Sequence, residues 1–146
     1  MSRESKTESP VLSMDDVSFS YAGGRYGAGV EGISLSLGRG EVALLCGPSG
    51  CGKTTVTRIA NGLAPHFYEG TETGTVSVCG IDVAREELWE TARYVGSVFQ
   101  NPKTQFYNVD VRGEVAFGCE NLGFEPSDID RRVDAAAREF DLAPLI

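Results

Sequence analysis

Residues 47–54 read Gly-Pro-Ser-Gly-Cys-Gly-Lys-Thr and match the pattern G-x-x-x-x-G-K-S/T at every fixed position. The glycines let the backbone turn tightly without an interfering Cβ, so that successive main-chain N–H groups can point into one concavity. Such a concavity attracts anions, and the lysine adds a cation while the threonine adds a hydroxyl. The octapeptide therefore predicts a site for a nucleoside triphosphate with its Mg²⁺. The alternative is a glycine-rich turn with a chance Lys-Thr.

The individual roles follow from the pattern. Lys53 is placed to reach the β and γ phosphates, the Thr54 hydroxyl is placed to ligate Mg²⁺, and Thr55 is expected to be a supporting hydroxyl. The predicted binding residues are contiguous in the chain: Gly47, Pro48, Ser49, Gly50, Cys51, Gly52, Lys53, Thr54 and Thr55.

The segments on either side of the loop fit this interpretation. Residues 42–46 form an unbroken apolar run, which predicts a central strand covered on both faces. Residues 53–62 are compatible with a helix whose N-terminal dipole end faces the phosphates, and Asn61-Gly62 supplies its stop. A strand, a loop and a helix are thus expected in the order that a phosphate site requires.

The composition is that of an ordinary soluble globular unit, with 41% hydrophobic and 23% charged residues in 146. A net charge of −8 repels nucleic acid, and the sequence shows no local basic patch. No apolar stretch approaches the ~20 residues of a membrane-spanning helix. Residues 1–10 are polar, without the apolar region of a secretion signal, and are expected to be a disordered leader.

The cysteines, at positions 46, 51, 79 and 119, show no C-x-x-C spacing of a zinc or redox site. Most are expected to be small buried hydrophobes in a reduced, cytoplasmic setting. Cys51 occupies a free position of the loop, where it is either a reactive thiol or a residue that fills space. His66 is the only histidine and is interpreted as a surface loop residue with no catalytic role.

Alternating apolar and polar residues predict further strands. Half-buried strands are expected at 17–21 and 33–37, paired antiparallel around a flexible turn at 23–29. A short strand is expected at 75–79. The apolar segment 94–99 is expected to be a strand beside the one that precedes the phosphate loop.

The remaining elements are expected to be helices, at 85–92, 115–122 and 127–141. Ser127 with Asp130 suggests a capping box at the start of the last helix. This helix carries an apolar stripe at 3.6-residue spacing, which is interpreted as core with a partner surface as the alternative. The stripe consists of Ile129, Val133, Ala136, Ala137 and Phe140.

Tyr21, the phosphate loop and Val-Phe-Gln-Asn-Pro at 98–102 follow one another in an order that resembles the ATP-binding subunit of ABC transporters. Within that superfamily, segments 61–70, 99–102 and 115–123 are similar to the energy-coupling-factor branch, which powers uptake of vitamins and metal ions.

The resemblance runs from about Val11 to the last residue and implies an α/β fold. This fold is the P-loop NTPase core of the ABC type, with a mixed sheet, N-terminal antiparallel strands and an incomplete C-terminal part.

The resemblance also implies roles for two further residues. Tyr21 matches the aromatic residue that stacks on adenine, and a core tyrosine of the strand is the alternative. Gln100 matches the glutamine of the Q-loop, which touches Mg²⁺ and the attacking water and is therefore a catalytic and metal-contacting candidate. Its place after an expected strand agrees with the ligand crevice of open α/β sheets. The alternative is a plain glutamine at a strand end.

The residues after Gln100 fall where this family receives the coupling helices of its transmembrane subunit. Exposed Phe106 and Tyr107 would suit such docking, and burial in a helical subdomain explains them equally well. The family often carries acidic residues where Lys103-Thr104 stands here, which puts the partner details in doubt. The implied partners are a transmembrane coupling subunit and a second ATP-binding subunit, with the chain peripheral at the cytoplasmic face of the cell membrane.

The sequence contains no signature segment of the Leu-Ser-Gly-Gly-Gln type, no strand ending in Asp-Glu (Walker B) and no later switch histidine. The chain is therefore interpreted as an N-terminal fragment, with the Walker A loop and the Q-loop, that binds ATP and Mg²⁺ but hardly hydrolyses ATP. The alternatives are a nucleotide-binding module without turnover and a soluble P-loop phosphotransferase.

Overall fold

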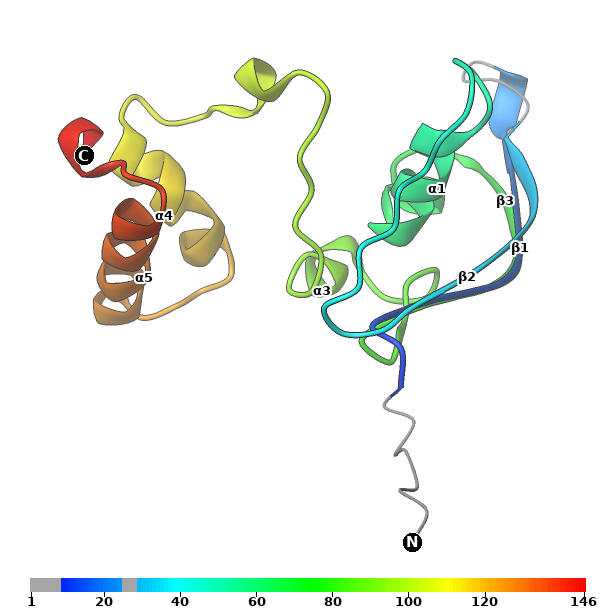
Figure 1. Ribbon diagram of the computed structural model, residues 1–146, viewed down its shortest axis with the longest axis horizontal. Coiled ribbons are helices and arrows are strands. Elements are labelled where there is room, and N and C mark those ends of the chain that lie inside the picture. The colour runs from blue at the N-terminus through cyan, green and yellow to red at the C-terminus, as the bar shows by residue number, and fades with distance from the viewer. Residues whose placement is uncertain (1–8, 25–28) are drawn as a thin grey trace, which may run out of the picture. The chain divides into compact units, whose positions relative to one another are not determined.

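The computed structural model describes residues 9–24 and 29–146 (Figure 1). The chain divides into two compact units, one that ends at Ser97 and one that runs from Val98 to Ile146. Most of the leader expected at 1–10 and of the turn expected at 23–29 lies outside the described residues.

The first unit is built on one antiparallel sheet in the order β2-β1-β3-β4. The predicted pairing of two N-terminal strands is confirmed, and both strands begin earlier than expected. A third long strand, expected only at 75–79, pairs along the other side of β1. The strands are β1 (Leu12–Tyr21), β2 (Val30–Leu37), β3 (Gly70–Val78) and β4 (Ile81–Asp82).

A bulge in β1 sets which side chains face the core. Met14 and Val17 are both buried although they are three positions apart, a spacing that a regular strand would place on opposite faces. The register of β1 with β2 shifts between these two residues, and Asp16 there has a φ of 48°. The inserted residue lets Met14 join Val17, Phe19 and Tyr21 on one apolar face.

Helix α1 (Lys53–Ala60) packs on this apolar face of the sheet (Figure 1). Its buried residues Val56 and Ile59 join the strand residues in one hydrophobic cluster. The backbone leaves the helix at Asn61, as predicted from the Asn-Gly pair. The shorter helices of this unit are η1 (Ala22–Gly24), α2 (Leu63–His66) and α3 (Leu88–Thr91). Helix α3 is a single turn, so only part of the helix expected at 85–92 forms.

The strands predicted at 42–46 and 94–99 do not form, and this prediction was wrong. Val42 is 94% exposed and Val98 is 92% exposed. A doubly covered strand needs neighbours that satisfy its backbone N–H and C=O groups. In the described parts of the chain all strands belong to the antiparallel sheet, and none of them pairs with either segment.

The cysteines also differ from the prediction of burial. Cys46, Cys51 and Cys79 are exposed, and Cys119 is half-buried. Cys46 is exposed because it belongs to the unpaired segment 42–46. All four cysteines are free thiols in the structure.

The second unit is a pair of helices, α4 (Val111–Asn121) and α5 (Pro126–Glu139), preceded by η2 (Pro102–Gln105) and followed by η3 (Ala143–Leu145). Arg112 of α4 joins the helices because its guanidinium pairs with Asp130 at 2.6 Å and Asp134 at 3.2 Å on α5. The Asp110 side chain caps α4 by accepting a hydrogen bond from the Gly113 N–H at 2.7 Å.

The start and the apolar stripe of α5 differ in part from expectation. The helix begins after Glu125, no side chain caps it, and the predicted Ser127 capping box is absent. Asp130, the expected partner of Ser127, pairs instead with Arg112 of α4. Within the stripe, Val133 and Ala137 are buried whereas Phe140 is exposed, so only part of the stripe serves as core.

Glu72, in the middle of β3, is half-buried, and this burial raises the pKa of its carboxyl group. The nearby charge of Asp82 raises the pKa further, and His66 opposes the shift. The folded state therefore disfavours the ionised form. Protonated Glu72 contributes to the stability of the folded state. This contribution is complete below the ordinary carboxyl pKa of 4.5 and is lost as the pH rises through the folded-state pKa of Glu72.

We predict that Glu72→Gln raises the melting temperature at neutral pH, because glutamine removes the disfavoured charge. The gain in melting temperature should vanish at a pH well below the ordinary carboxyl pKa of 4.5, where Glu72 is protonated in both the folded and the unfolded state. Thermal unfolding followed by circular dichroism at both pH values measures this. Glu69→Gln, on an exposed neighbour, is the matched control. An equal gain at both pH values would contradict the role of ionisation.

Candidate functional site

The phosphate loop leads directly into α1, and two of its glycines are required by their contacts. Gly47 has a φ of 151°, and a Cβ there would lie 2.6 Å from the Cys51 sulfur. Gly52 has a φ of 95°, and a Cβ there would lie 2.5 Å from a methyl carbon of Val30 on β2. Both positions therefore exclude larger residues. The loop thus curls back on itself at Gly47 and contacts the sheet at Gly52.

The Lys53 ammonium lies within the curl of the loop. Its Nζ donates hydrogen bonds to the carbonyl oxygens of Gly47 at 2.9 Å and Pro48 at 2.7 Å. The Cys51 sulfur lies 3.5 Å from the same nitrogen. The loop thus concentrates a full positive charge where the sequence predicts phosphates.

The first turn of α1 supplies donors beside this charge. Gly52 is the N-cap, and the hydrogen bond from Val56 N–H to Gly52 C=O, at 3.0 Å, opens the helical series. The preceding N–H groups, of Lys53, Thr54 and Thr55, therefore have no acceptor within the helix. Together with the helix dipole they favour an anion at this end. The exposed Thr54 is free to reach solvent, as a Mg²⁺ ligand must.

Thr55 has a different environment from Thr54. It is 6% exposed, and its Oγ1 accepts a hydrogen bond from the Tyr21 hydroxyl of β1 at 3.1 Å. Arg58, one turn along α1, donates from Nη1 to the same tyrosine oxygen at 3.0 Å. The Arg58 guanidinium also lies over the Tyr68 ring, 3.8 Å from its centroid. The start of α1 is therefore tied to β1 by polar contacts.

Arg58 and Tyr68 were not among the residues predicted from sequence. The available signal was the three-residue spacing of Thr55 and Arg58, which places both on one face of a helix that begins at the loop. Nothing in the sequence indicates that Tyr68 lies beside them.

Tyr21, the candidate for stacking on adenine, is buried in this structure. It is 5% exposed, and its ring packs edge-on against Phe19 with ring centroids 4.9 Å apart. Tyr68 makes a second edge contact, with centroids 6.4 Å apart. Stacking on adenine requires an open ring face, and the adenine role of Tyr21 stays a prediction beside the core alternative.

Gln100 is exposed and belongs to the second unit, whereas Lys53 and Thr54 belong to the first. The catalytic and metal roles of Gln100 stay predictions. In the same unit Phe106 and Tyr107 are both exposed, as docking would require.

His66 is exposed as expected, but it is the last residue of α2 and does not lie in a loop. Its Nε2 lies 3.1 Å from the Val83 carbonyl oxygen. This contact agrees with a structural role.

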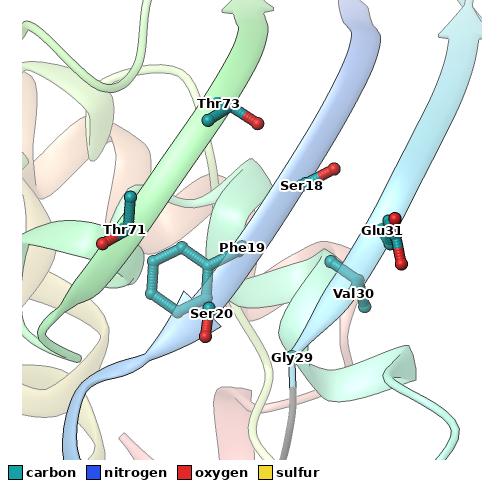
Figure 2. A pocket seen from close by; sticks show the side chains of 8 residues that line it. All are labelled: Ser18, Phe19, Ser20, Gly29, Val30, Glu31, Thr71 and Thr73. Atoms are coloured by element: carbon teal, nitrogen blue, oxygen red, sulfur yellow. The ribbon is translucent and has the colours of Figure 1, made fainter.

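A separate hollow of about 430 Å³ lies over the sheet, and Figure 2 shows hydroxyl side chains of β1 and β3 along it. Among the described residues its lining includes Glu31 and no basic side chain, so the chemistry of this lining does not suit a polyphosphate. The eight lining residues are Ser18, Phe19, Ser20, Gly29, Val30, Glu31, Thr71 and Thr73. The donors that suit phosphates lie instead at the loop and at the start of α1.

The loop is a chemical fit for the phosphates of ATP, since it combines a glycine curl, an ammonium and helix N–H groups. The Mg²⁺ that accompanies ATP prefers oxygen ligands and keeps several waters, which one exposed threonine hydroxyl and the phosphates satisfy. Among the described residues no cluster of three or more histidine, cysteine, aspartate or glutamate side chains could hold a resident metal. None of the described helices has the length and apolar character needed to cross a bilayer.

Comparison with known proteins places these observations in a family. The family model described as "ABC transporter" matches residues 30–145. A putative ABC transporter ATP-binding protein of Treponema denticola is 39% identical over 135 residues, which cover 92% of this chain and 27% of the relative. A protein of the same name from Methanosarcina mazei is 38% identical over 130 residues, 89% of this chain and 22% of the relative.

A relative with a more specific name is the energy-coupling factor transporter ATP-binding protein EcfA1 of Bacillus subtilis. It is 35% identical over 139 residues, 95% of this chain and 48% of the relative. The chain thus spans about a quarter of the length of the first two relatives and about half the length of the third.

We predict that Gly47→Ala weakens the binding of Mg-tripolyphosphate about tenfold or more, because the new Cβ meets the Cys51 sulfur and the residue has an unfavourable φ. Isothermal titration calorimetry measures the affinity. Adding Cys51→Ala should restore part of the loss, since it removes the contact but not the φ strain. Gly96→Ala is the matched control, because a Cβ there meets nothing within 4 Å. Equal affinity of Gly47→Ala and the unchanged chain would contradict the curled loop.

Proposed function

The chain belongs to the ABC transporter family of ATP-binding proteins, and on this premise we propose that it binds Mg-ATP through residues 47–55. The observation that carries the proposal is the Lys53 ammonium held inside a glycine curl at the start of α1. In this proposal the ammonium exchanges the loop carbonyls for β and γ phosphate oxygens. The loop and helix N–H groups bind the remaining oxygens, and Thr54 ligates Mg²⁺.

We propose a role for Gln100 in the reaction of the complete protein. Hydrolysis requires a water to attack the γ phosphorus while the bond to the β–γ bridging oxygen breaks, which gives ADP and inorganic phosphate. The attacking water must be positioned and the developing charge stabilised. Gln100 would position that water and contact Mg²⁺, in agreement with the family pattern at 98–102.

We further propose that the complete protein is the ATPase subunit of an energy-coupling-factor importer. The support is the similarity of segments 61–70, 99–102 and 115–123 to that branch, and the 35% identity to a relative that carries its name. A transmembrane coupling subunit and a second ATP-binding subunit would then be its partners at the cytoplasmic face of the membrane. The exposed Phe106 and Tyr107 suit contact with the transmembrane partner.

A second candidate for these 146 residues is nucleotide binding without turnover. Lys53 is the charged group at the described loop, and no carboxylate contacts it there. A cation and backbone donors hold phosphates, but they do not accept a proton from water. The soluble phosphotransferase alternative has less support, because the family match extends far beyond the loop.

We predict that Lys53→Ala weakens binding of Mg-ATP on the order of 10- to 100-fold, because it removes charge-assisted hydrogen bonds to the phosphates. Calorimetry with purified protein measures the change. Lys103→Ala removes the same charge from an exposed residue of the second unit and should leave the affinity unchanged. Equal affinities of Lys53→Ala and the unchanged chain would refute the assignment of the loop.

We also predict that the 146-residue chain releases phosphate from Mg-ATP at a rate close to that of buffer. A coupled phosphate assay at saturating ATP measures this rate, with Lys53→Ala as the background sample. Robust turnover that disappears in Lys53→Ala would show that these residues are sufficient for hydrolysis.

A further inference from the structure

The side chain of Asn61, at the end of α1, makes two hydrogen bonds. Its Oδ1 accepts from the Leu63 N–H at 3.1 Å, and its Nδ2 donates to Ser97 Oγ at 2.9 Å. A backbone N–H can only donate, so the bond from Leu63 fixes which end of the amide is the oxygen. The amide nitrogen therefore faces Ser97, which lies 36 positions later in the chain.

The backbone around Asn61 holds this side chain in place. The Asn61 N–H bonds the Thr57 carbonyl oxygen, and the Gly62 N–H bonds that of Ile59, both at 3.1 Å. Gly62 is buried, with a φ of 76°, and a Cβ there would lie 3.3 Å from a methyl carbon of Val83. The end of α1 is thus fixed by its backbone hydrogen bonds and by close packing.

The segment that leads to Gln100 is held at two places. Val95 packs against the hydrophobic cluster of the first unit, and its N–H bonds the Thr91 carbonyl oxygen at 3.1 Å. Two positions later, Ser97 accepts the hydrogen bond from Asn61. Ser97 is also the last residue of the first unit.

No later contact of this kind precedes Gln100. Residues 98–100 make no hydrogen bond within the described parts of the chain. Three residues span at most about 11 Å, so the position of Ser97 limits where Gln100 can lie. The hydrogen bond from Asn61 therefore sets the point from which the chain continues to Gln100.

Helix α1 thus has a role at each end. Its first turn carries the N–H groups that suit phosphates, and the residue that ends it holds Ser97. We propose that Asn61 is a positioning residue for nucleotide binding, which acts through Ser97 and restricts Gln100 to places from which it serves the Mg²⁺-bound complex. This inference rests on the proposed binding of Mg-ATP by the loop and on the proposed contact of Gln100 with Mg²⁺.

The test measures the affinity for ATP by calorimetry, once with Mg²⁺ and once with EDTA. Ser97→Ala removes the acceptor from an exposed residue. We expect it to weaken Mg-ATP about two- to fivefold, as for loss of one hydrogen bond, and to leave Mg-free ATP unchanged, because Gln100 acts through the metal. Ser97→Thr keeps the hydroxyl and should retain the affinity. Ser127→Ala removes the same atom from an exposed residue of the second unit and is the matched control.

Two double-mutant cycles test the route from Asn61 through Ser97 to Gln100. We expect Ser97→Ala to cause no further loss of Mg-ATP affinity in the Asn61→Ala background or in the Gln100→Ala background. Each variant is measured at a low temperature where circular dichroism shows it folded, and the cycle with Gln100→Ala does not need the Asn61→Ala protein. Additive losses in either cycle would overturn the proposal.

Two outcomes of the Ser97→Ala experiment would show a structural role alone and overturn the proposal. One is a lower melting temperature with unchanged affinities. The other is an equal loss of affinity for Mg-ATP and Mg-free ATP, because support of α1 as a whole does not depend on the metal.

The remaining outcomes separate this proposal from those on which it rests. If Lys53→Ala weakens Mg-ATP but Gln100→Ala does not, the role of Gln100 fails and the role of Asn61 fails with it, while the loop assignment stands. If the unchanged chain binds ATP neither with Mg²⁺ nor without it, the proposed function itself fails.

Discussion

The start of α1 must be fixed in space for the phosphate loop to act as a site, and the antiparallel sheet provides this support. Two contacts make the connection: the Tyr21 hydroxyl bonds Thr55 from β1, and Val30 of β2 lies against Gly52. The segment that precedes the loop contributes no ladder hydrogen bonds in the described residues. The position of the loop therefore depends on side-chain contacts with strands that come earlier in the chain.

The overall charge of the chain makes these local contacts more important. With a net charge of −8, the long-range field of the protein repels a polyphosphate. Attraction must come from groups at short range, which here are the Lys53 ammonium and the N–H groups of the first helical turn. Interactions of this kind weaken steeply with distance and misalignment. A site of this type thus depends on a well-held loop more than on total charge.

Local sequence patterns correctly predicted the elements whose structure depends mainly on residues nearby in the chain. The helix from Lys53 to its stop at Asn61 and the antiparallel pairing of β1 with β2 were both predicted correctly. The errors concern segments whose state depends on partners elsewhere. The apolar run at 42–46 needs neighbouring strands, and apolar composition alone does not supply them. The capping box at Ser127 failed because Pro126 already begins α5, so its N-cap is Glu125.

Lys53 is bound to its own loop, and this affects which anions the site accepts. The ammonium already has two carbonyl oxygens as partners, those of Gly47 and Pro48. A polyphosphate presents many oxygens, so it compensates the ammonium and the loop amides in one step. In the proposed site, binding of a polyphosphate would therefore replace the two carbonyl partners of Lys53 with phosphate oxygens.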